Sequence, residues 1–195
     1  MTPLRITMLG DSLTAGYGLR AGEALPVRLQ TELKRLGHPA AVSNAGVSGD
    51  TTSDGLRRID RDVPDDTCLC IVALGANDMM QLLATDQLRK NLDAIFERLS
   101  ARAIPAMLCG MRAPPWFGLY AIAFDGVFAE VARRHRIALY PFLLDGIALN
   151  PAYALADRLH PNAKGIDVIA RRLAPSVAKV LTRYPDCPTE LSPSI

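Results

Sequence analysis

The chain has 195 residues, of which 49% are hydrophobic and 22% are charged, and its formal net charge at neutral pH is +2. This composition is typical of globular proteins and excludes a disordered chain, and no apolar run approaches the length that spans a bilayer. Because acidic and basic residues are interleaved, we expect no nucleic acid partner, no binding to an anionic membrane surface and no stable membrane insertion.

Apolar runs of strand length recur along the chain, with helical segments between most of them. The runs cover residues 4–9, 40–43, 68–74, 104–109 and 137–142. Most are continuous rather than alternating, as in strands that are buried on both faces of a parallel sheet. Apolar residues with helical spacing cover residues 25–36, 88–99, 121–136 and 166–180. This alternation predicts an α/β domain with helices on both faces of a parallel sheet.

A single domain accounts for residues 1–185, because the chain shows no internal repeat and no linker. Residues 186–195 are rich in proline and serine, and we expect them to form a loose tail. The first ten residues differ from a secretory signal, since their apolar part is short and runs directly into Gly10. We therefore expect a cytoplasmic protein as printed, or a periplasmic or secreted one if a leader was removed.

The four cysteines show neither a Cys-x-x-Cys motif nor a zinc-like spacing with histidine. Cys68 and Cys70 are two residues apart in one apolar run, so they share one face of a strand and do not easily bridge each other. We expect the cysteines to be small buried hydrophobic residues.

Small, polar and acid–base residues follow the predicted strands where these end. They are residues 10–13 (GDSL), 44–51 (NAGVSGDT), 75–78 (GAND) and, after a longer loop, 157–161 (DRLHP). Ligands of such sheets bind at the carboxyl ends of the strands, so we expect these groups to meet there. The preference of these residue types for turns explains each group singly, but it explains the set less well.

His160 is the one histidine of three that we place at this edge of the sheet. We place His38 at the opposite edge and His135 at a solvated, basic helix end. Asp157 precedes His160 by three residues, and a turn would bring its carboxylate to the imidazole and orient it as a general base. Pro161 suits the first position of the helix that follows. The alternative is an ordinary histidine at a helix start, with Asp157 solvated.

A histidine base needs a nucleophile to activate, and two serines compete for this role. Ser48 lies in GVSGD, a near match to the Gly-x-Ser-x-Gly nucleophile elbow. Ser12 directly follows the first strand, where a helix can start with its backbone N–H free to bind an anion. The residues alone favour Ser12 only slightly. An oxyanion would find donors in the N–H of Ser12, the N–H of Gly49 and the side-chain amide of Asn77.

Four blocks in this order and spacing, at residues 10–13, 48–51, 75–78 and 157–162, resemble those of the SGNH or GDSL hydrolase superfamily. Within it, the chain resembles the bacterial arylesterase, thioesterase I and lysophospholipase L1 group over residues 4–181. The resemblance implies a three-layer α/β/α fold around a flavodoxin-like, five-stranded parallel sheet, without a metal or organic cofactor.

The resemblance also assigns roles to the candidate residues. It implies that Ser12 is the nucleophile and that Asp157 and His160 complete the catalytic triad. It implies that Gly49 and Asn77 join Ser12 in the oxyanion hole, which leaves Ser48 as a neighbour of that loop.

Two apolar groups follow the third and fourth strands and flank the nucleophile. We expect an acyl or aryl groove lined by Met79, Met80, Pro115, Trp116, Phe117 and Tyr120. Packing of these loops on the core is an equally good explanation. No insertion is large enough for a lid, so we expect an open site with broad specificity for small-molecule esters. The oligomeric state cannot be predicted from these residues.

The sequence thus predicts a serine hydrolase that cleaves aryl and short-to-medium acyl esters through an acyl-enzyme on Ser12. An acyl-CoA thioesterase or a lysophospholipase would use the same residues on another leaving group, and an acyltransferase would share the acyl-enzyme. A non-catalytic nucleotide-binding module, with residues 10–18 as its phosphate loop, is a remote alternative. The chain has no Gly-x-Gly-x-x-Gly and no Gly-Lys-Ser/Thr after the first strand.

Overall fold

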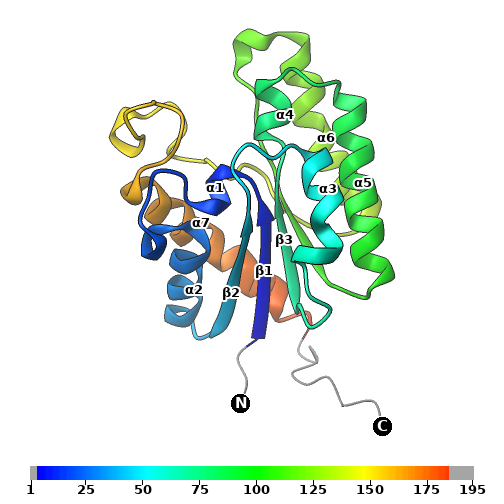
Figure 1. Cartoon of the computed structure of the whole chain (residues 1–195), viewed down its shortest axis with the longest axis vertical. Helices are drawn as coiled ribbons and strands as arrows, with labels where there is room; N and C mark the ends of the chain where they lie inside the picture. Colours follow the sequence, from blue (N-terminus) through cyan, green and yellow to red (C-terminus); the bar gives the residue numbers. More distant parts are fainter. Residues whose placement is uncertain (1–3, 185–195) are drawn as a thin grey trace.

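A five-stranded parallel sheet forms the centre of the computed structural model, which describes residues 4–184 (Figure 1). The strands are β1 (Leu4–Gly10), β2 (Ala40–Gly46), β3 (Leu69–Ala73), β4 (Ala106–Cys109) and β5 (Ala138–Tyr140). They pair in the order β2-β1-β3-β4-β5, and every pair is parallel. This is the flavodoxin-like order, so the predicted fold class is confirmed.

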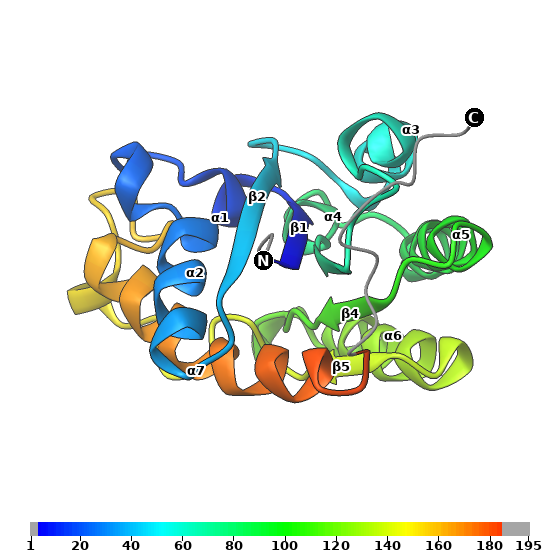
Figure 2. The same cartoon turned by 90° about the horizontal axis from the view of Figure 1, so that it is seen from below.

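The long helices cover both faces of the sheet. They are α2 (Leu25–Arg35), α3 (Thr52–Asp62), α5 (Thr85–Ala101), α6 (Leu119–His135) and α7 (Ala163–Leu181). α2 packs against α7 on one face, whereas α5 packs between α3 and α6 on the other (Figure 2). All of these helices except α3 present a mainly apolar stripe to the sheet. Leu25, Leu29 and Leu33 of α2, for example, are fully buried, and each contributes about 1.5–3 kcal/mol by burial.

The register of the central strands brings the candidate site together. Gly10, the last residue of β1, lies opposite Gly46 of β2 and Ala73 of β3. The loops that follow these three strands therefore leave the sheet at one edge, side by side. Two short helices start there, α1 (Ser12–Ala15) after β1 and α4 (Ala76–Met80) after β3 (Figure 1).

Helix α3 is not predicted from the sequence, because its segment TSDGLRRIDRD is too polar to show an apolar stripe. Its buried face consists of Thr52, Gly55, Arg58 and Ile59, so that an arginine occupies a position where an apolar residue is expected. The missed signal is a capping box, in which Thr51 and Asp54 each accept the other's backbone N–H.

The cysteines follow the prediction only in part. Cys70 and Cys109 are free, buried thiols, and burial raises the pKa of each to about 12. Cys68 is buried as predicted, but it is also disulfide-bonded, which the prediction missed. Cys187 and the predicted tail at residues 186–195 lie outside the described residues. Among residues 4–184, none of the helices is long and apolar enough to cross a membrane.

Candidate active site

Ser12, His160 and Asp157 form a continuous row of side-chain hydrogen bonds. Nε2 of His160 lies 3.0 Å from Oγ of Ser12, and Nδ1 of His160 lies 2.7 Å from Oδ2 of Asp157. An ionised carboxylate only accepts, so Nδ1 carries a proton and Nε2 accepts from the serine hydroxyl. Ser12 opens α1, whereas Asp157 and His160 belong to the loop before α7, so the row joins segments 148 residues apart.

The loop holds Asp157 in place through its own backbone. Oδ1 of Asp157 accepts the N–H of Leu159 at 2.9 Å and the N–H of His160 at 3.0 Å. Arg158 between them adopts a left-handed conformation with φ of 59°. The hydrogen bond from the His160 side chain, followed by these backbone N–H groups, lowers the pKa of Asp157 to about 2. Its carboxylate is therefore ionised at neutral pH.

The start of α7 differs from the prediction. The helix begins at Ala163, and the side chain of Asn162 caps it by accepting the N–H of Gly165 at 3.0 Å. Pro161 lies before this cap in an isolated β-bridge with Ala154, so its predicted place as the first helical residue is wrong. The bridge holds the end of the Asp157–His160 loop.

Two contacts made by histidine rings are not predicted from the sequence. The ring of Tyr17 packs on the imidazole of His160, with ring centroids 4.3 Å apart. The only signal for Tyr17 is its position soon after Ser12. His135 is half-buried and bonded to Asp93 at 2.8 Å, so its predicted solvated position is wrong.

A sharp turn presents Ser12 above the sheet. The side chain of Asp11 caps α1 by accepting the N–H of Leu13 at 3.0 Å. A Cβ atom at Gly10 would lie 2.0 Å from Oγ1 of Thr14 and 2.9 Å from the carbonyl of Ala73, so only glycine fits. Because Ser12 is the first residue of α1, its N–H has no acceptor within the helix and is available to a bound anion.

The other two candidate oxyanion donors are linked to each other. Gly49 has φ of +90°, a conformation that favours glycine. One N–H of the Asn77 side chain donates to the carbonyl of Asp50, the residue after Gly49, at 2.9 Å. The second N–H of this amide can donate to a bound anion. Ser48, in the same loop, is exposed, and the imidazole of His160 bonds Ser12 instead.

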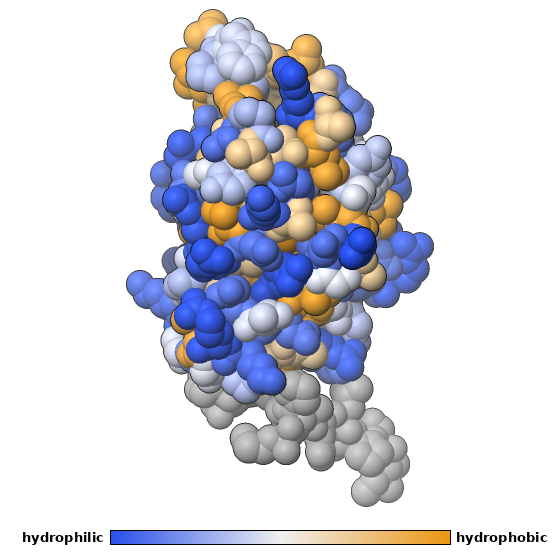
Figure 3. Space-filling model, turned by 90° about the vertical axis from the view of Figure 1, so that its left-hand side faces the viewer, coloured by the Kyte–Doolittle hydropathy of each residue, from blue (hydrophilic) through white to orange (hydrophobic). Residues whose placement is uncertain are grey.

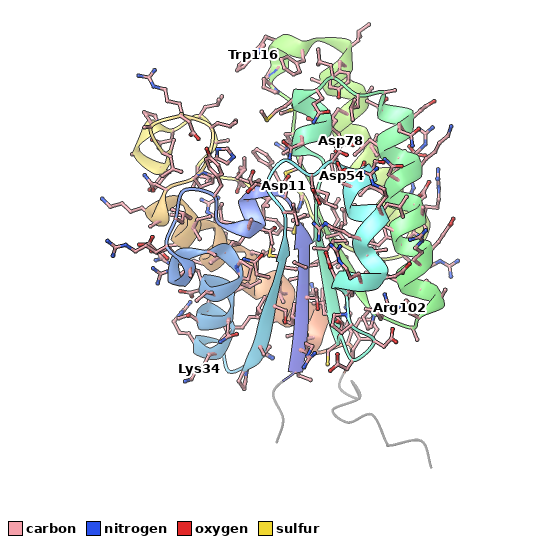
Figure 4. The ribbon with its side chains drawn as sticks, viewed as in Figure 1. Asp11, Lys34, Asp54, Asp78, Arg102 and Trp116 are labelled. Atoms are coloured by element: carbon pink, nitrogen blue, oxygen red, sulfur yellow. The ribbon has the colours of Figure 1, made fainter. Side chains whose placement is uncertain are left out.

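Asp78 joins the segment of Asn77 to the start of α3. Its carboxylate is fully buried and accepts the N–H of Thr52 at 2.9 Å and its hydroxyl at 2.6 Å. Asn91 of α5 donates to the same hydroxyl at 3.0 Å. Burial raises the pKa of Asp78. Figure 4 shows Asp78 and Asp11 at the same end of the sheet, where β1 ends.

The raised pKa of Asp11 makes the stability of the protein depend on pH. Burial raises the pKa of Asp11 from 3.8 to about 7, and its Oδ2 has no hydrogen-bond partner among the described residues. Between these two pH values the folded protein keeps a proton that the unfolded chain releases, so stability falls as the pH rises through this window. Asp11→Asn is expected to remove this fall in the free energy of unfolding, which is at most about 4 kcal/mol. The asparagine amide oxygen can still accept the N–H that caps the helix.

Urea unfolding of the wild type and of Asp11→Asn between pH 4 and 8 measures this effect. Asp54→Asn is the control, because hydrogen bonds with Thr51 lower the pKa of Asp54 below its usual 3.8, so this change should leave the slope of stability between pH 4 and 8 as in the wild type. An ordinary aspartate at position 11 would instead give two parallel stability curves.

The apolar residues after β3 and β4 divide into two sets. Met79, Phe117 and Tyr120 pack partly against the core, and the Tyr120 hydroxyl donates to the carbonyl of Leu83 at 3.0 Å. The second set consists of Met80, Pro115 and Trp116, which are exposed. Trp116 lies at the tip of the molecule beyond the strand ends (Figure 4). Figure 3 shows hydrophobic side chains interspersed with hydrophilic ones over the upper and middle parts of the face that it draws.

A serine bonded to a carboxylate-held imidazole, at the carboxyl ends of a parallel sheet, is the arrangement of a serine hydrolase. Residues 8–168 match the GDSL-like Lipase/Acylhydrolase family. The chain therefore belongs to this family, and the resemblance to GDSL and SGNH hydrolases is confirmed. By family it is a carboxylic ester hydrolase.

Individual relatives agree with this membership. The chain is 33% identical over 158 residues to Esterase TesA of Pseudomonas aeruginosa, covering 80% of this chain and 79% of that one. It is 30% identical over 182 residues to an arylesterase of Vibrio mimicus, covering 91% and 90%. The solved structure of AlinE4, an SGNH-hydrolase family esterase, is 43% identical with a TM-score of 0.77, covering 92% and 97%.

Proposed function

We propose that the protein hydrolyses aryl and short-to-medium acyl esters through an acyl-enzyme on Ser12. The observation that carries the proposal is the row in which Oγ of Ser12 lies 3.0 Å from His160 and His160 lies 2.7 Å from Asp157. A serine hydroxyl is a weak nucleophile until a neighbouring base takes its proton, and this row supplies the base. The similarity to esterases supports the same chemistry.

The reaction follows from these positions. Nε2 of His160 takes the hydroxyl proton while Oγ of Ser12 forms a bond to the ester carbonyl carbon. Asp157 stabilises the imidazolium that results. The carbonyl oxygen becomes an oxyanion and accepts from the N–H groups of Ser12 and Gly49 and the amide of Asn77. The C–O bond then breaks, and His160 gives its proton to the departing alkoxide or phenoxide.

Deacylation repeats these steps with water. His160 removes a proton from a water molecule whose oxygen bonds to the acyl carbon. The bond from that carbon to Oγ of Ser12 breaks, and the serine regains its proton from His160. The carboxylic acid product leaves, and the row of hydrogen bonds is restored.

The exposed apolar set of Met80, Pro115 and Trp116 offers a surface to the acyl or aryl group. Trp116 has 69% of its surface exposed, so it holds no large part of the fold together. Each methylene that a ligand buries is worth about 0.8 kcal/mol, so an open surface of this kind favours longer chains only up to its own length.

Trp116→Ala is therefore expected to raise KM for p-nitrophenyl octanoate by about 3–10-fold, because roughly 1 kcal/mol of apolar contact is lost. KM for p-nitrophenyl acetate should change by less than about twofold. Val27→Ala, which shortens an exposed apolar residue of α2, is the control. An equal change of KM for both esters would argue against a chain-binding role.

The class of substrate is tested by kcat/KM for p-nitrophenyl esters, octanoyl-CoA and lysophosphatidylcholine measured side by side. We expect the aryl esters to give the highest values. A preference for octanoyl-CoA or for lysophosphatidylcholine would assign the same residues to a thioesterase or a lysophospholipase. Thermal stabilisation by mononucleotides without any hydrolysis would contradict the proposal and favour a nucleotide-binding module.

The disulfide at Cys68 bears on location, because disulfides persist mainly in oxidising compartments. It favours the periplasmic or secreted alternative over the cytoplasmic one. Thiol titration of the unfolded, unreduced protein should detect fewer than four thiols, and four would contradict this assignment.

A further inference from the structure

We propose that Arg58 of α3 is a positioning residue of the oxyanion hole, which holds the three candidate donors in register with one another. This inference rests on the proposed ester hydrolysis. It goes further by giving a function to a buried charge that touches none of the reacting atoms.

The guanidinium of Arg58 is buried, with 8% of the side chain exposed, and it reaches the ends of two neighbouring strands. Nη2 donates to the carbonyl of Gly10 at 2.8 Å, and Nη1 donates to the carbonyl of Ala45 at 2.8 Å. Nε lies 2.6 Å from Oδ2 of Asp50, and Nη1 lies 2.9 Å from Oδ2 of Asp62. One side chain therefore binds β1, β2 and the loop after β2 at the edge where the site lies.

Two of these bonds, to Gly10 and to Asp50, lie close in sequence to an oxyanion donor. Gly10 is two residues before Ser12, and its carbonyl accepts the N–H of Val47 as well as Arg58. Asp50 follows Gly49 directly. The carbonyl of Asp50 is also the acceptor that holds the Asn77 amide at 2.9 Å. The segments that carry the donors of Ser12, Gly49 and Asn77 are thus connected by the hydrogen bonds of Arg58 and Asp50.

The contacts require an arginine. A planar guanidinium can donate in several fixed directions at once, whereas an ammonium is a compact charge that cannot match four acceptors at these separations. Asp50 and Asp62 compensate the buried charge. A buried ion pair is weak evidence for stability, since apolar residues of similar volume often serve as well. The value of Arg58 is better explained by the geometry that it imposes on the loops.

Arg58→Lys and Arg58→Met test the proposal with a p-nitrophenyl ester. Removal of a single oxyanion donor costs about 10²–10³-fold in kcat, so imperfect placement of the donors is expected to lower kcat by about 10–100-fold. KM should stay within about threefold, because the acyl group binds elsewhere. Inhibition by a boronic acid that mimics the tetrahedral intermediate should weaken by the same factor as kcat.

Arg102 supplies a matched control at the other end of α3. Its guanidinium binds the carbonyl of Val63 and the carboxylate of Asp65, and it is likewise mostly buried. Figure 4 shows Arg102 at the end of the molecule opposite Asp11. Arg102→Met should lower the melting temperature and leave kcat unchanged. A purely structural Arg58 would behave in the same way as Arg102.

A double variant separates positioning from general loss of structure. If Arg58 acts through the oxyanion hole, Arg58→Met combined with Asn77→Ala should lower kcat by much less than the product of the two single effects. Asp50→Asn, which keeps the backbone carbonyl but removes the anionic partner, is expected to lower kcat as well. If Arg58→Met does not fold, kcat of Asp50→Asn tests the positioning role instead.

Unchanged kcat in folded Arg58→Lys and Asp50→Asn, or fully multiplicative effects of Arg58→Met and Asn77→Ala, would overturn the positioning role. These results would leave Ser12-dependent hydrolysis intact. Failure of the proposed function itself is distinguishable, because hydrolysis by the wild type would then be absent or insensitive to Ser12→Ala.

Discussion

Ser12→Ala is expected to lower kcat for a p-nitrophenyl ester by about 10⁴–10⁶-fold, since loss of the nucleophile removes the acyl-enzyme route entirely. A residual rate above that in buffer should remain, because the oxyanion donors and the binding surface still act on the ester. KM should change little. Initial rates with freshly purified variant, free of wild-type contamination, measure this effect.

Ser48→Ala is the matched control for Ser12→Ala. Both changes remove one hydroxyl from the loops at the same edge of the sheet, but Ser48 is exposed and lies outside the hydrogen-bonded row. Its kcat should stay within about twofold of the wild type, as for most surface changes. The opposite outcome, an inactive Ser48→Ala and an active Ser12→Ala, would move the nucleophile to the Gly-x-Ser motif.

His160→Ala is expected to lower kcat nearly as far as Ser12→Ala, by about 10⁴–10⁶-fold, because Oγ of Ser12 then has no proton acceptor. The Ser12→Ala, His160→Ala double variant should be no slower than either single variant, since the residues act as a unit. Multiplicative losses in the double variant would show that they act in separate steps.

Asp157→Asn should reduce kcat by about 10⁴-fold, because an amide no longer selects the imidazole tautomer with its proton on Nδ1. Hydrogen bonds from His160 and its neighbours lower the pKa of Asp157 to about 2, so the carboxylate is ionised throughout the assay range. Any loss of wild-type activity between pH 4 and 7 should therefore reflect a group other than Asp157. A profile of kcat/KM against pH tests this expectation.

The strands and the edge at which the site forms follow from the sequence for simple reasons, whereas the flavodoxin-like strand order follows from the family resemblance. Continuous apolar runs identify strands that are buried on both faces, and β3 is indeed fully buried. The polar groups that follow those runs converge because parallel strands end at one edge. The spacing of Asp157 and His160 is short enough for one turn to join them, as it does.

The features that escape prediction depend on contacts between distant segments. Arg58 lies in the charged stretch GLRRIDRD, which suggests a solvated helix face, yet its partner Gly10 is 48 residues away. The pairing of His135 with Asp93 spans 42 residues, so nothing near His135 in the chain reveals it. In both cases the partner comes from an element that only the folded sheet brings close.

The most direct test of the account is treatment with a fluorophosphonate followed by peptide mapping of the adduct by mass spectrometry. The reagent's phosphorus is attacked by an activated serine, and fluoride leaves. We predict a single adduct on Oγ of Ser12, strongly reduced in His160→Ala and absent in Ser12→Ala. An adduct on Ser48, or no adduct in a folded and unmodified protein, would contradict the assignment of Ser12 as the nucleophile.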